Sequence, residues 1–600
     1  MTVATTAKRS KALQHRSPGR AGPVLSLAFI LALGSFGLLP QVRDNPALMR
    51  AFAGATGLLM AAWGLVWTRR PSQAANVRVV LRPQHYLQAI AHASIFVYWG
   101  LYWDPILDAV PLIAGQIVFA YALDTLLVWW RRDTYMLGFG PFPIVFSTNL
   151  FLRFRDDWFY LQFVMIGVGF LAKEFIRWNK DGRRVHIFNP SSFPLALASL
   201  LLILTGTSHL TWGEEIATTL FQPPHIFLFI FLVALPGQYL FGVTTMTLSA
   251  VLTTYAFGLA YFAVTGTYFF IDNYIPIAVF LGMHLLFTDP STSPRSELGR
   301  IIYGAIYGVS VVALYWLLAR IGAPTFYDKL LQVPLMNLLV RFIDRNAQTR
   351  LAWLDPARLG RRLTPMRRNL LYTSLWVLVF AGMTAAHGVG DYHPGHDVRF
   401  WEQACREGRR AGCTILGRIE TRYCSLGAGW ACNEVGILMA EGRLEDNSQS
   451  MDAFARACGL GFAAGCQNRQ LPPAETRARH DDPRLSDFVL ILREGKGPLP
   501  DQSPADTFAR GCRKGWVAGC GELGGLYLMG NGVPQDRLRA SALLQEACDG
   551  GHPASCTNLA LMYDLGDGIA RDQARSRALL RKACDLGLTD ACRWLADRGK

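Results

Sequence analysis

The first 404 residues of this 600-residue chain contain no cysteine, although the whole chain has 12. Charged residues are also scarce, at 17% of the chain, whereas hydrophobic residues make up 51% and are concentrated in the same N-terminal part. This imbalance excludes an ordinary soluble protein and predicts a membrane protein that carries a soluble domain.

The chain also lacks the short motifs of common soluble enzymes. It shows no zinc-ligand spacing, nucleophile elbow, phosphate-binding P-loop or GxGxxG fingerprint, so we predict no catalytic residues and no metal site of these classes. The net charge of +15 does not indicate nucleic-acid binding. Its lysines and arginines lie in short clusters beside apolar runs, as the positive-inside rule expects.

Apolar runs predict a series of membrane-spanning helices. The chain opens with a basic stretch, residues 1–22, and we interpret the following run Val24–Leu39 as a retained first span rather than a signal peptide. The segment 137–152 opens with GFGPFP and is short, which predicts a broken or re-entrant helix. The predicted spans are 24–39, 51–67, 85–103, 108–130, 137–152, 158–176, 191–208, 225–242, 245–265, 272–288, 300–319 and 370–386.

Alternation of these spans predicts the side of each loop. It places the basic clusters Arg131–Arg132 and Lys173–Arg184 on the cytoplasmic side, but it places 320–369 outside, which conflicts with the many arginines there. Either one span is miscounted, or the amphipathic segment Phe326–Phe342 is a further crossing or an interfacial helix. Arginines ahead of the last span then send the C-terminal part outside.

Two proline motifs interrupt the apolar region: HIFNPSSF at His186–Phe193 and FTDPSTSP at Phe287–Pro294. Proline breaks the helical ladder, and at membrane depth such a break is tolerated only where it faces protein or a polar cavity. Each motif therefore predicts a buried site, with Asn189 and Asp289 as its central polar residues. The structural alternative stays open for both, because Asn189 could satisfy freed backbone groups and Asp289 could cap the next helix.

These motifs and the continuation FTDPSTSPRSELGRIIYGAIYG resemble the NqrB/RnfD family over residues 85–345. Members of that family are integral membrane proteins of the sodium-pumping NADH:quinone reductase and of the Rnf electron-transport complex. The resemblance implies a bacterial inner-membrane bundle built from two inverted halves. It also implies flavin, either FMN or riboflavin, further electron-transport subunits as partners, and coupling of electron transfer to Na⁺ or H⁺ movement. The cofactor-binding positions that it implies are Asn189, Pro190, Ser191, Thr288, Asp289, Ser291 and Ser293.

The sequence departs from that family at the flavin attachment point. The family binds FMN covalently through the threonine of an SGAT-like motif, whereas this chain reads LTGTSHLTWGEEIATTLF at 204–221. We therefore expect non-covalent flavin. Two alternatives stay open: a membrane-anchored envelope scaffold that has lost the redox role, and a small-molecule transporter.

A few further polar residues lie within apolar spans. Asp124 is an ion-pathway candidate because an ionisable group is costly there. Ser147 and Asn149 either line a polar cavity or bond back to their own helix. His186 and His284 are either proton carriers or packed residues.

All cysteines lie in the C-terminal part and follow the pattern C-x2-G-x4-C. Eight positions on one continuous helix would span about 12 Å, too far for a disulfide, so the glycine is expected to end one helix and let the next fold back. An even number of regularly spaced cysteines predicts an oxidising, extracytoplasmic compartment. The predicted disulfides are Cys405–Cys413, Cys424–Cys432, Cys458–Cys466, Cys512–Cys520, Cys548–Cys556 and Cys584–Cys592.

The last cysteine pairs belong to a repeat. Tyr527 and Asp536 recur as Tyr563 and Asp572, an offset of 36 that is typical of α-solenoids. The stretches GLYLMGNGVPQD and LMYDLGDGIARD resemble cysteine-rich Sel1-like repeats, which implies an extracytoplasmic protein partner. The resemblance covers about 400–600, with a Pro/Arg-rich interruption at 467–506, and a stabilising cap without a partner is the alternative.

The sequence therefore predicts an all-α protein, namely a polytopic transmembrane helix bundle with two inverted halves followed by a disulfide-stapled α-solenoid. The predicted domains are an N-terminal basic segment with the first spans at 1–80, a membrane domain at 81–345, a basic loop and last span at 346–392, and the repeat domain at 393–600. Membrane lipid is a further predicted partner, and nucleic acid is not.

Overall fold

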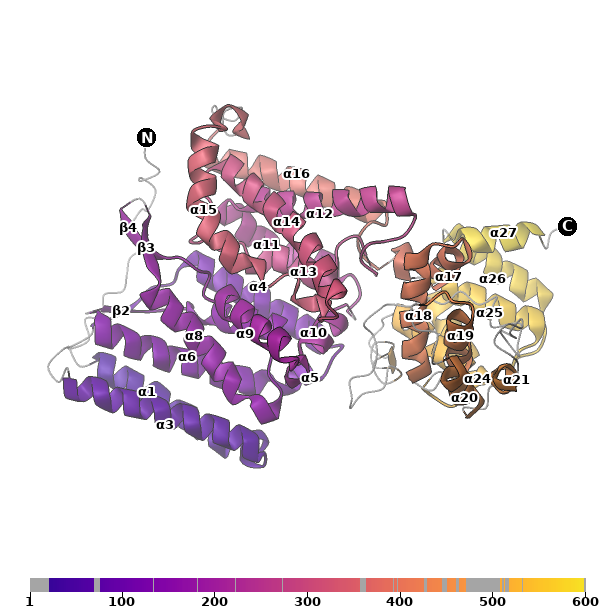
Figure 1. Cartoon of the computed structure of the whole chain (residues 1–600), viewed down its shortest axis with the longest axis horizontal. Coiled ribbons are helices and arrows are strands. Elements are labelled where there is room, and N and C mark those ends of the chain that lie inside the picture. The colour runs from indigo at the N-terminus through magenta and orange to yellow at the C-terminus, as the bar shows by residue number, and fades with distance from the viewer. Residues whose placement is uncertain are drawn as a thin grey trace. The chain divides into compact units, whose positions relative to one another are not determined.

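A computed structural model gives two compact units, one comprising Met1–Leu220, Ile226–Ala256 and Ile277–Gly382, and the other comprising Phe221–His225, Phe257–Pro276 and Met383–Lys600. We call them the bundle unit and the repeat unit (Figure 1). The structure describes residues 21–69, 76–132, 134–180, 182–221, 223–271, 273–356, 363–391, 393–396, 398–425, 429–444, 450–459, 463–470, 505, 508–509, 512, 517–530, 532–586 and 588–597.

The described β-strands of the bundle unit all lie in its first part. Strand β1 (Asn76–Val79) pairs in parallel with β2 (Thr134–Leu137), and β3 (Arg177–Lys180) forms an antiparallel hairpin with β4 (Arg183–His186). The helices are α1 (Ala21–Ser35), η1 (Phe36–Leu38), α2 (Pro40–Arg43), α3 (Pro46–Arg69), α4 (Pro83–Gly100), α5 (Pro105–Asp108), α6 (Val110–Arg131), α7 (Pro141–Phe151), η2 (Asp156–Trp158), α8 (Tyr160–Phe175), α9 (Ser192–Thr205), η3 (Ser208–Leu210) and α10 (Gly213–Thr219).

The second part of the bundle unit includes a π-helix, η4 (Gly282–Leu286), in which Phe287 N donates to Gly282 O at 3.3 Å. The remaining helices are α11 (Ile226–Phe241), α12 (Thr244–Thr265), α13 (Ile277–Leu281), α14 (Glu297–Arg320), η5 (Thr325–Tyr327), α15 (Gln332–Gln348), η6 (Ala352–Leu354) and α16 (Pro365–Ala385). Each predicted span contains a helix. Among the described residues, the helices Pro46–Arg69, Pro105–Arg131, Thr244–Thr265 and Glu297–Arg320 are long and apolar enough to cross a membrane.

Helix α15 settles the chain path after α14. Near the end of α15, Asp344 accepts hydrogen bonds from the backbone N–H groups of Arg295 and Ser296, at 3.0 and 3.1 Å, just before α14 begins. At the start of α16, Arg368 lies 3.8 Å from Glu297. Helix α15 therefore runs back along α14, and Arg368 at the start of α16 lies at the same end of the bundle as Arg300.

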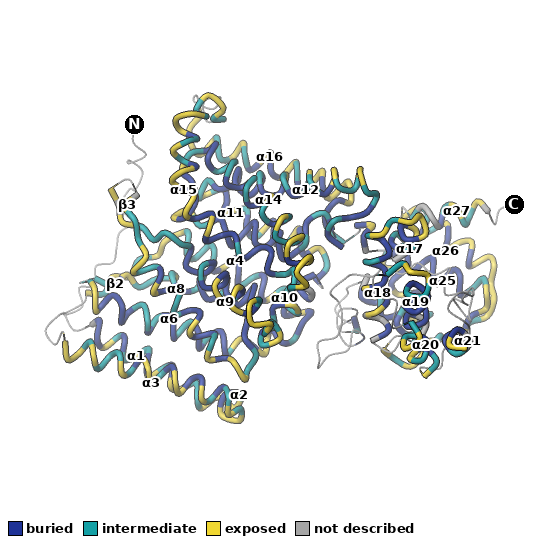
Figure 2. The backbone as a smooth tube through the Cα atoms, in the orientation of Figure 1, coloured by how far each residue is buried: buried dark blue, intermediate teal, exposed yellow. Residues whose placement is uncertain are grey.

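Figure 2 shows exposed residues along the outer helices α1 and α3 of the bundle unit. Many of the exposed residues of this unit are large and apolar. Val24, Leu58 and Leu204 are 64%, 70% and 72% exposed, whereas Trp99 and Tyr307 are completely buried. Such a broad apolar exterior marks an interaction surface, and it is compatible with contact with lipid.

The repeat unit consists of short helices in which sequence neighbours pack against one another. Its helices are η8 (Pro394–His396), α17 (Val398–Arg406), α18 (Arg410–Ser425), α19 (Gly429–Ala440), α20 (Ser450–Gly459), α21 (Ala463–Gln470), α23 (Val517–Met529), α24 (Arg537–Asp549), α25 (Pro553–Leu565), α26 (Gln573–Asp585) and α27 (Thr589–Asp597). Most of the predicted interruption at 467–506 lies outside the described residues.

The repeat unit also includes a segment that precedes it by more than a hundred residues. The chain after α12 supplies Tyr268 and Ile271, which share a buried cluster with Trp401 and Cys405. The Arg409 guanidinium also donates a hydrogen bond to the carbonyl of Gly266. The repeat domain predicted to begin at residue 393 does not include Phe257–Pro276. Sequence pattern alone does not show that this segment packs against helices more than a hundred residues later.

Candidate functional site

The two proline motifs lie against each other in the bundle unit. The Asn189 side-chain amide donates to Leu286 O at 2.9 Å, at the end of the π-helix. The Asn189 backbone N–H donates to the side chain of Asn337 at 3.0 Å, and His186 Nε2 lies 3.4 Å from Asp289 Oδ2. Two motifs 100 positions apart thus form one joint, which α15 completes.

Asn189 uses both ends of its side chain within this joint. Its Oδ1 accepts from the backbone N–H groups of Ser191 and Ser192, at 3.0 and 3.2 Å, and from the Ser191 hydroxyl at 2.8 Å. Pro190 lies so close to α8 that a Cβ added to Gly169 would be only 2.3 Å from the Pro190 carbonyl oxygen. The residues of HIFNPSSF therefore stabilise the start of α9 and its contact with α8.

The second motif is also satisfied internally. Asp289 accepts from the Ser291 N–H at 2.9 Å and from the Thr292 hydroxyl at 3.3 Å, and the Thr288 hydroxyl donates to His284 O at 2.9 Å. The N-cap of α14 is Ser296, which accepts from Gly299 N, so the cap role considered for Asp289 is wrong. Ser293 is buried, whereas Ser291 is exposed.

These contacts test whether the predicted cofactor-binding residues fit a flavin. A flavin is recognised through hydrogen bonds to its ring edge, which need polar groups that are open to a ligand. The side chains of Asn189, Ser191, Thr288 and Asp289 instead hydrogen-bond to one another or to nearby backbone. The joint as it stands therefore does not fit a flavin site.

The predicted ion-pathway residues fall into two places. Ser147 Oγ lies 2.9 Å from His92 Nε2, and the Asn149 amide donates to Gln116 Oε1 at 2.6 Å, so buried polar pairs join α7 to α4 and α6. Asp124 interacts with the Tyr135 hydroxyl. It lies eight residues beyond Gln116 on α6, which is about 12 Å along the helix axis.

The sequence did not single out several buried charged residues, among them Glu297, Asp328 and Lys329. Glu297 is 4% exposed; its Oε1 lies 2.9 Å from Arg300 Nη1, and its Oε2 accepts from Thr245 at 3.1 Å. Asp328 and Lys329 are also buried, with 3.5 Å between Oδ1 and Nζ. In the sequence, Glu297 looks like an ordinary acidic residue in a first helical turn, and its burial depends on distant residues.

All six predicted disulfides are present, with Cα–Cα distances of 4.4–4.7 Å. Gly408 and Gly551 have φ values of +78° and +89°, which confirms the left-handed turn that ends the first helix in the pairs Cys405–Cys413 and Cys548–Cys556. The corresponding glycines of the other four pairs lie outside the described residues. The turn between the two helices therefore brings the cysteines of a pair within bonding distance.

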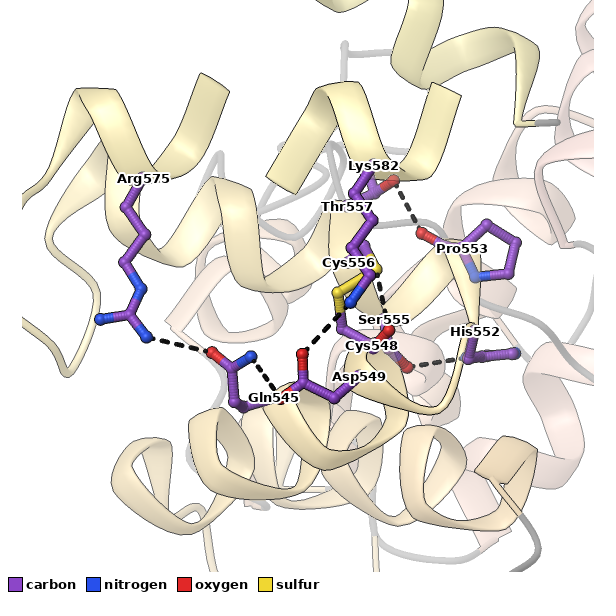
Figure 3. Close-up of a disulfide and its surroundings, with 10 residues drawn as sticks. All are labelled: Gln545, Cys548, Asp549, His552, Pro553, Ser555, Cys556, Thr557, Arg575 and Lys582. Carbon is purple, nitrogen blue, oxygen red and sulfur yellow. Dashed lines mark hydrogen bonds and ion pairs between the residues drawn. A yellow bond between two sulfur atoms is a disulfide. The ribbon is translucent and has the colours of Figure 1, made fainter. Parts of the chain in front are cut away.

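Polar contacts link neighbouring helices around the Cys548–Cys556 disulfide (Figure 3). Asp549 on α24 accepts from Gln545 at 2.9 Å and from Lys582 on α26 at 3.2 Å, and these hydrogen bonds lower the pKa of the Asp549 carboxyl. Arg575 on α26 donates to Gln545 at 3.4 Å. These contacts tie successive repeats together on their exposed side.

The 36-residue offset recurs in the contacts. Asp536 caps α24 and Asp572 caps α26, while Arg539 lies 4.3 Å above the Tyr527 ring and Arg575 lies 4.8 Å above the Tyr563 ring. A groove of about 610 Å³ is lined by Tyr527, Pro534, Gln535, Asp536, Arg537, Leu538, Arg539 and Gly568. Its Leu538 is 69% exposed, so the groove offers an apolar side chain among charged ones.

The model of the Sel1 repeat family matches residues 517–552 and 553–588, which confirms the expected repeats. The chain is 37% identical over 124 residues to cytochrome c oxidase assembly factor 7 from Xenopus tropicalis, and 35% identical over 124 residues to factor 7A from Xenopus laevis. Each match covers 20% of this chain and 46% of the relative, so the chain spans about half the length of these relatives.

Two solved structures are also similar to parts of the chain. The Sel1 repeat protein from Oxalobacter formigenes is 18% identical, with a TM-score of 0.16, over 28% of this chain and 64% of that one. The antigen c5321 of uropathogenic Escherichia coli is 16% identical, with a TM-score of 0.16, over 68% of this chain and 88% of that one.

Proposed function

We propose that the chain is a membrane component of an electron-transport system of the Rnf and sodium-pumping reductase type, with a repeat unit that binds a protein on the extracytoplasmic side. The observation that supports this most is the joint between HIFNPSSF and FTDPSTSP. These are the two motifs that carry the resemblance, and Asn189 and Leu286 bring them together.

The order of helix lengths supports two inverted halves. Helices α6 and α12 each have 22 residues. Each is followed by a short apolar helix, α7 with 11 residues or α13 with five residues continued by the π-helix η4. Two further helices complete each series, α8 and α9 in the first and α14 and α15 in the second. Paired interrupted helices of this kind are typical of inverted-repeat transport folds.

The resemblance implies flavin, as FMN or riboflavin bound non-covalently. Such a flavin would have to bind outside the motif joint, because the polar groups of the joint are already paired with protein. The polar groups of the motif joint satisfy one another, and this observation favours a second candidate function, a membrane-anchored envelope scaffold without a redox role.

The visible absorbance of the purified full-length protein separates the two candidates. Flavin that is present in the folded protein and released by denaturation supports the electron-transport proposal. Folded protein without flavin absorbance contradicts it and leaves the scaffold. Flavin that stays with the denatured chain contradicts non-covalent binding.

The groove beside Tyr527 supports the protein-binding part of the proposal. Helical repeats bind partners along exposed surfaces, and the two frog relatives are named as assembly factors of cytochrome c oxidase. By analogy with these relatives, we propose that the repeat unit of this chain binds a respiratory membrane protein. A photoreactive residue at Leu538 in intact cells should crosslink to a component of an electron-transport complex, whereas one at the exposed Leu586 should not. Equal crosslinking from both positions would contradict a binding site at the groove.

A further inference from the structure

The π-helix holds a histidine with one open nitrogen. His284 is 1% exposed, and its Nδ1 lies 2.7 Å from the carbonyl oxygen of Phe280. A carbonyl oxygen only accepts hydrogen bonds, so Nδ1 carries the proton and Nε2 presents a lone pair. Among the described residues, Nε2 has no hydrogen-bond partner. π-Helical turns are frequent at functional sites.

His92 provides a matched comparison in the first part of the same unit. It is completely buried, and its Nδ1 likewise contacts the carbonyl four residues earlier, Gln88 O at 2.6 Å. Its Nε2, however, lies 2.9 Å from the Ser147 hydroxyl. The two buried histidines therefore differ at a single atom, which is paired in His92 and open in His284.

More open polar atoms lie around His284. The Trp376 ring lies 5.9 Å from the His284 ring, and its Nε1 has no partner among the described residues. Both amide atoms of Gln238, which is 2% exposed, are also open within that part of the chain. Buried polar atoms are usually paired with protein or with ordered water, so these atoms are the positions at which internal water would find hydrogen-bond partners.

The open atoms follow two antiparallel helices. Phe231 on α11 contacts Trp376 on α16 with 5.3 Å between ring centroids, and farther along the pair the Asn369 amide donates to Tyr239 O at 3.0 Å. Gln238 lies seven residues after Phe231, about 10.5 Å along α11 and toward the start of α16. The start of α16 is where Arg368 meets Glu297.

Hydroxyl groups continue the polar series toward Glu297. Thr244 at the start of α12 lies 3.4 Å from Thr373 on α16. The next residue, Thr245, donates to Glu297. Polar side chains thus occur at the level of Glu297, at the level of Gln238, and at the level of His284 and Trp376.

We propose that a file of buried water leads from Glu297 past Gln238 to His284, and that His284 accepts a proton through it. The proton passes from the Glu297 carboxyl along the water file to His284 Nε2, which becomes an imidazolium. Glu297 returns to a carboxylate and is reprotonated from bulk water. The rings packed against His284 are those of Phe231, Phe280 and Trp376, none of which titrates in this range. The proposal rests on the proposed ion-coupled function and assigns the proton as the ion.

Deuterium exchange at the imidazole C2 position tests this in the full-length protein, because it reports water and proton access at each histidine. His284 should exchange at least about tenfold faster than the equally buried His92, since its environment is hydrated. The exposed His387 serves as the open reference in every sample. Protection of His284 equal to that of His92 would overturn the proposal.

Two variants separate the water file from the mere lack of a partner. Gln238→Met keeps the length of the side chain but removes its polar atoms, and it should slow His284 exchange toward the His92 rate while His387 is unchanged. Unchanged His284 exchange in this variant would overturn the file. Ser147→Ala removes the partner of His92 without providing a file, so His92 should stay protected. Fast His92 exchange there would show that an open nitrogen alone suffices, and would overturn the file.

The exchange result is independent of flavin. Fast His284 exchange in protein without flavin absorbance would contradict the electron-transport proposal but support the water file. A protected His284 in flavin-containing protein would support the electron-transport proposal but contradict the water file.

Discussion

The bundle unit and the repeat unit are both helical, but they are held together differently. The bundle unit has no cysteine. Its broken helices are joined by buried hydrogen bonds, such as the one from the Asn189 side chain to the backbone carbonyl of Leu286. The repeat unit has all six disulfides, each of which joins two cysteines that are eight residues apart in the sequence. One unit depends on a few long-range hydrogen bonds, the other on many local covalent links.

The difference follows from what each unit can bury. The bundle unit packs large aromatic side chains such as Trp99 and Tyr307 and has apolar outer faces. The repeat unit has short helices, each of which contacts mainly its neighbours, so its core grows in only one direction. Disulfides compensate for the small core of such a unit.

Reduction of the disulfides should break the comparison most strongly. Closing a loop of this length contributes about 2–3 kcal/mol per disulfide by the chain-entropy estimate, so the loss of six should unfold the repeats. In the reduced full-length protein, amide exchange in α24–α26 should become fast. Exchange in α14 and α15 should be unchanged, and equal acceleration in both units would contradict the division.

Removal of the long-range joint should affect the bundle unit next. Asn189→Ala loses the hydrogen bond to Leu286 O and three accepted bonds, which should destabilise the unit by about 2–4 kcal/mol. The denaturant midpoint for loss of amide protection in α9 measures this. Asn346→Ala, which removes one surface contact on α15, should cost less than about 0.5 kcal/mol. Equal effects of both variants would show that the joint has no special role.

The stability of the repeat unit should depend on pH through the buried His393. His393 is buried, and burial first, then the charge of His387, lowers its pKa from 6.5 to about 3. Below pH 6.5 the unfolded chain binds a proton that the folded unit excludes, so stability should fall by about 1 kcal/mol per pH unit down to about pH 3. Amide exchange in α17 at pH 7 and pH 5 measures the change.

The control for this pH effect is His393→Gln. Its side-chain oxygen can still accept the hydrogen bond that His393 Nδ1 accepts from Gly395 N at 3.0 Å, but it does not titrate. The variant should lose most of the pH dependence in α17. The same pH slope in both proteins would assign the effect to another group.

The cation–π contacts should give the smallest effect. Arg539→Ala and Arg575→Ala each remove a guanidinium from above a tyrosine ring and should destabilise the repeat unit by about 0.5–1 kcal/mol. Arg577→Ala removes a neighbouring exposed arginine that only approaches Gln573 O at 3.4 Å. A cost for Arg577 equal to that for Arg575 would mean that the ring contact adds nothing.

The sequence predicted most of the repeat unit, because its structure is local. The spacing of Cys548, Gly551 and Cys556 contains the turn, the left-handed glycine and the disulfide within one short stretch. The 36-residue offset likewise predicted equivalent positions for Asp536 and Asp572, and in the structure each of them caps a helix. The apolar runs predicted the bundle helices for a similar reason, since hydrophobic length is a property of each segment alone.

The sequence did not predict which distant segments meet. Prolines follow Asn189 and Asp289 in the sequence, but only the folded chain shows that Asn189 binds Leu286 O and that Ser296, not Asp289, caps α14. The path of α15 also depends on the contact between Asp344 and Ser296. Burial of Glu297 between Thr245 and Arg300 is another tertiary effect that residue type and spacing do not reveal.

Labelling of thiols in intact cells tests the central claim most directly, namely that a membrane bundle carries a stapled repeat unit on the extracytoplasmic side. After mild reduction, a membrane-impermeant maleimide should label the native cysteines of intact cells. A single cysteine introduced as Asn346→Cys in α15, in a chain whose native cysteines are blocked, should be labelled only after permeabilisation. Native cysteines that react only in permeabilised cells would contradict the account.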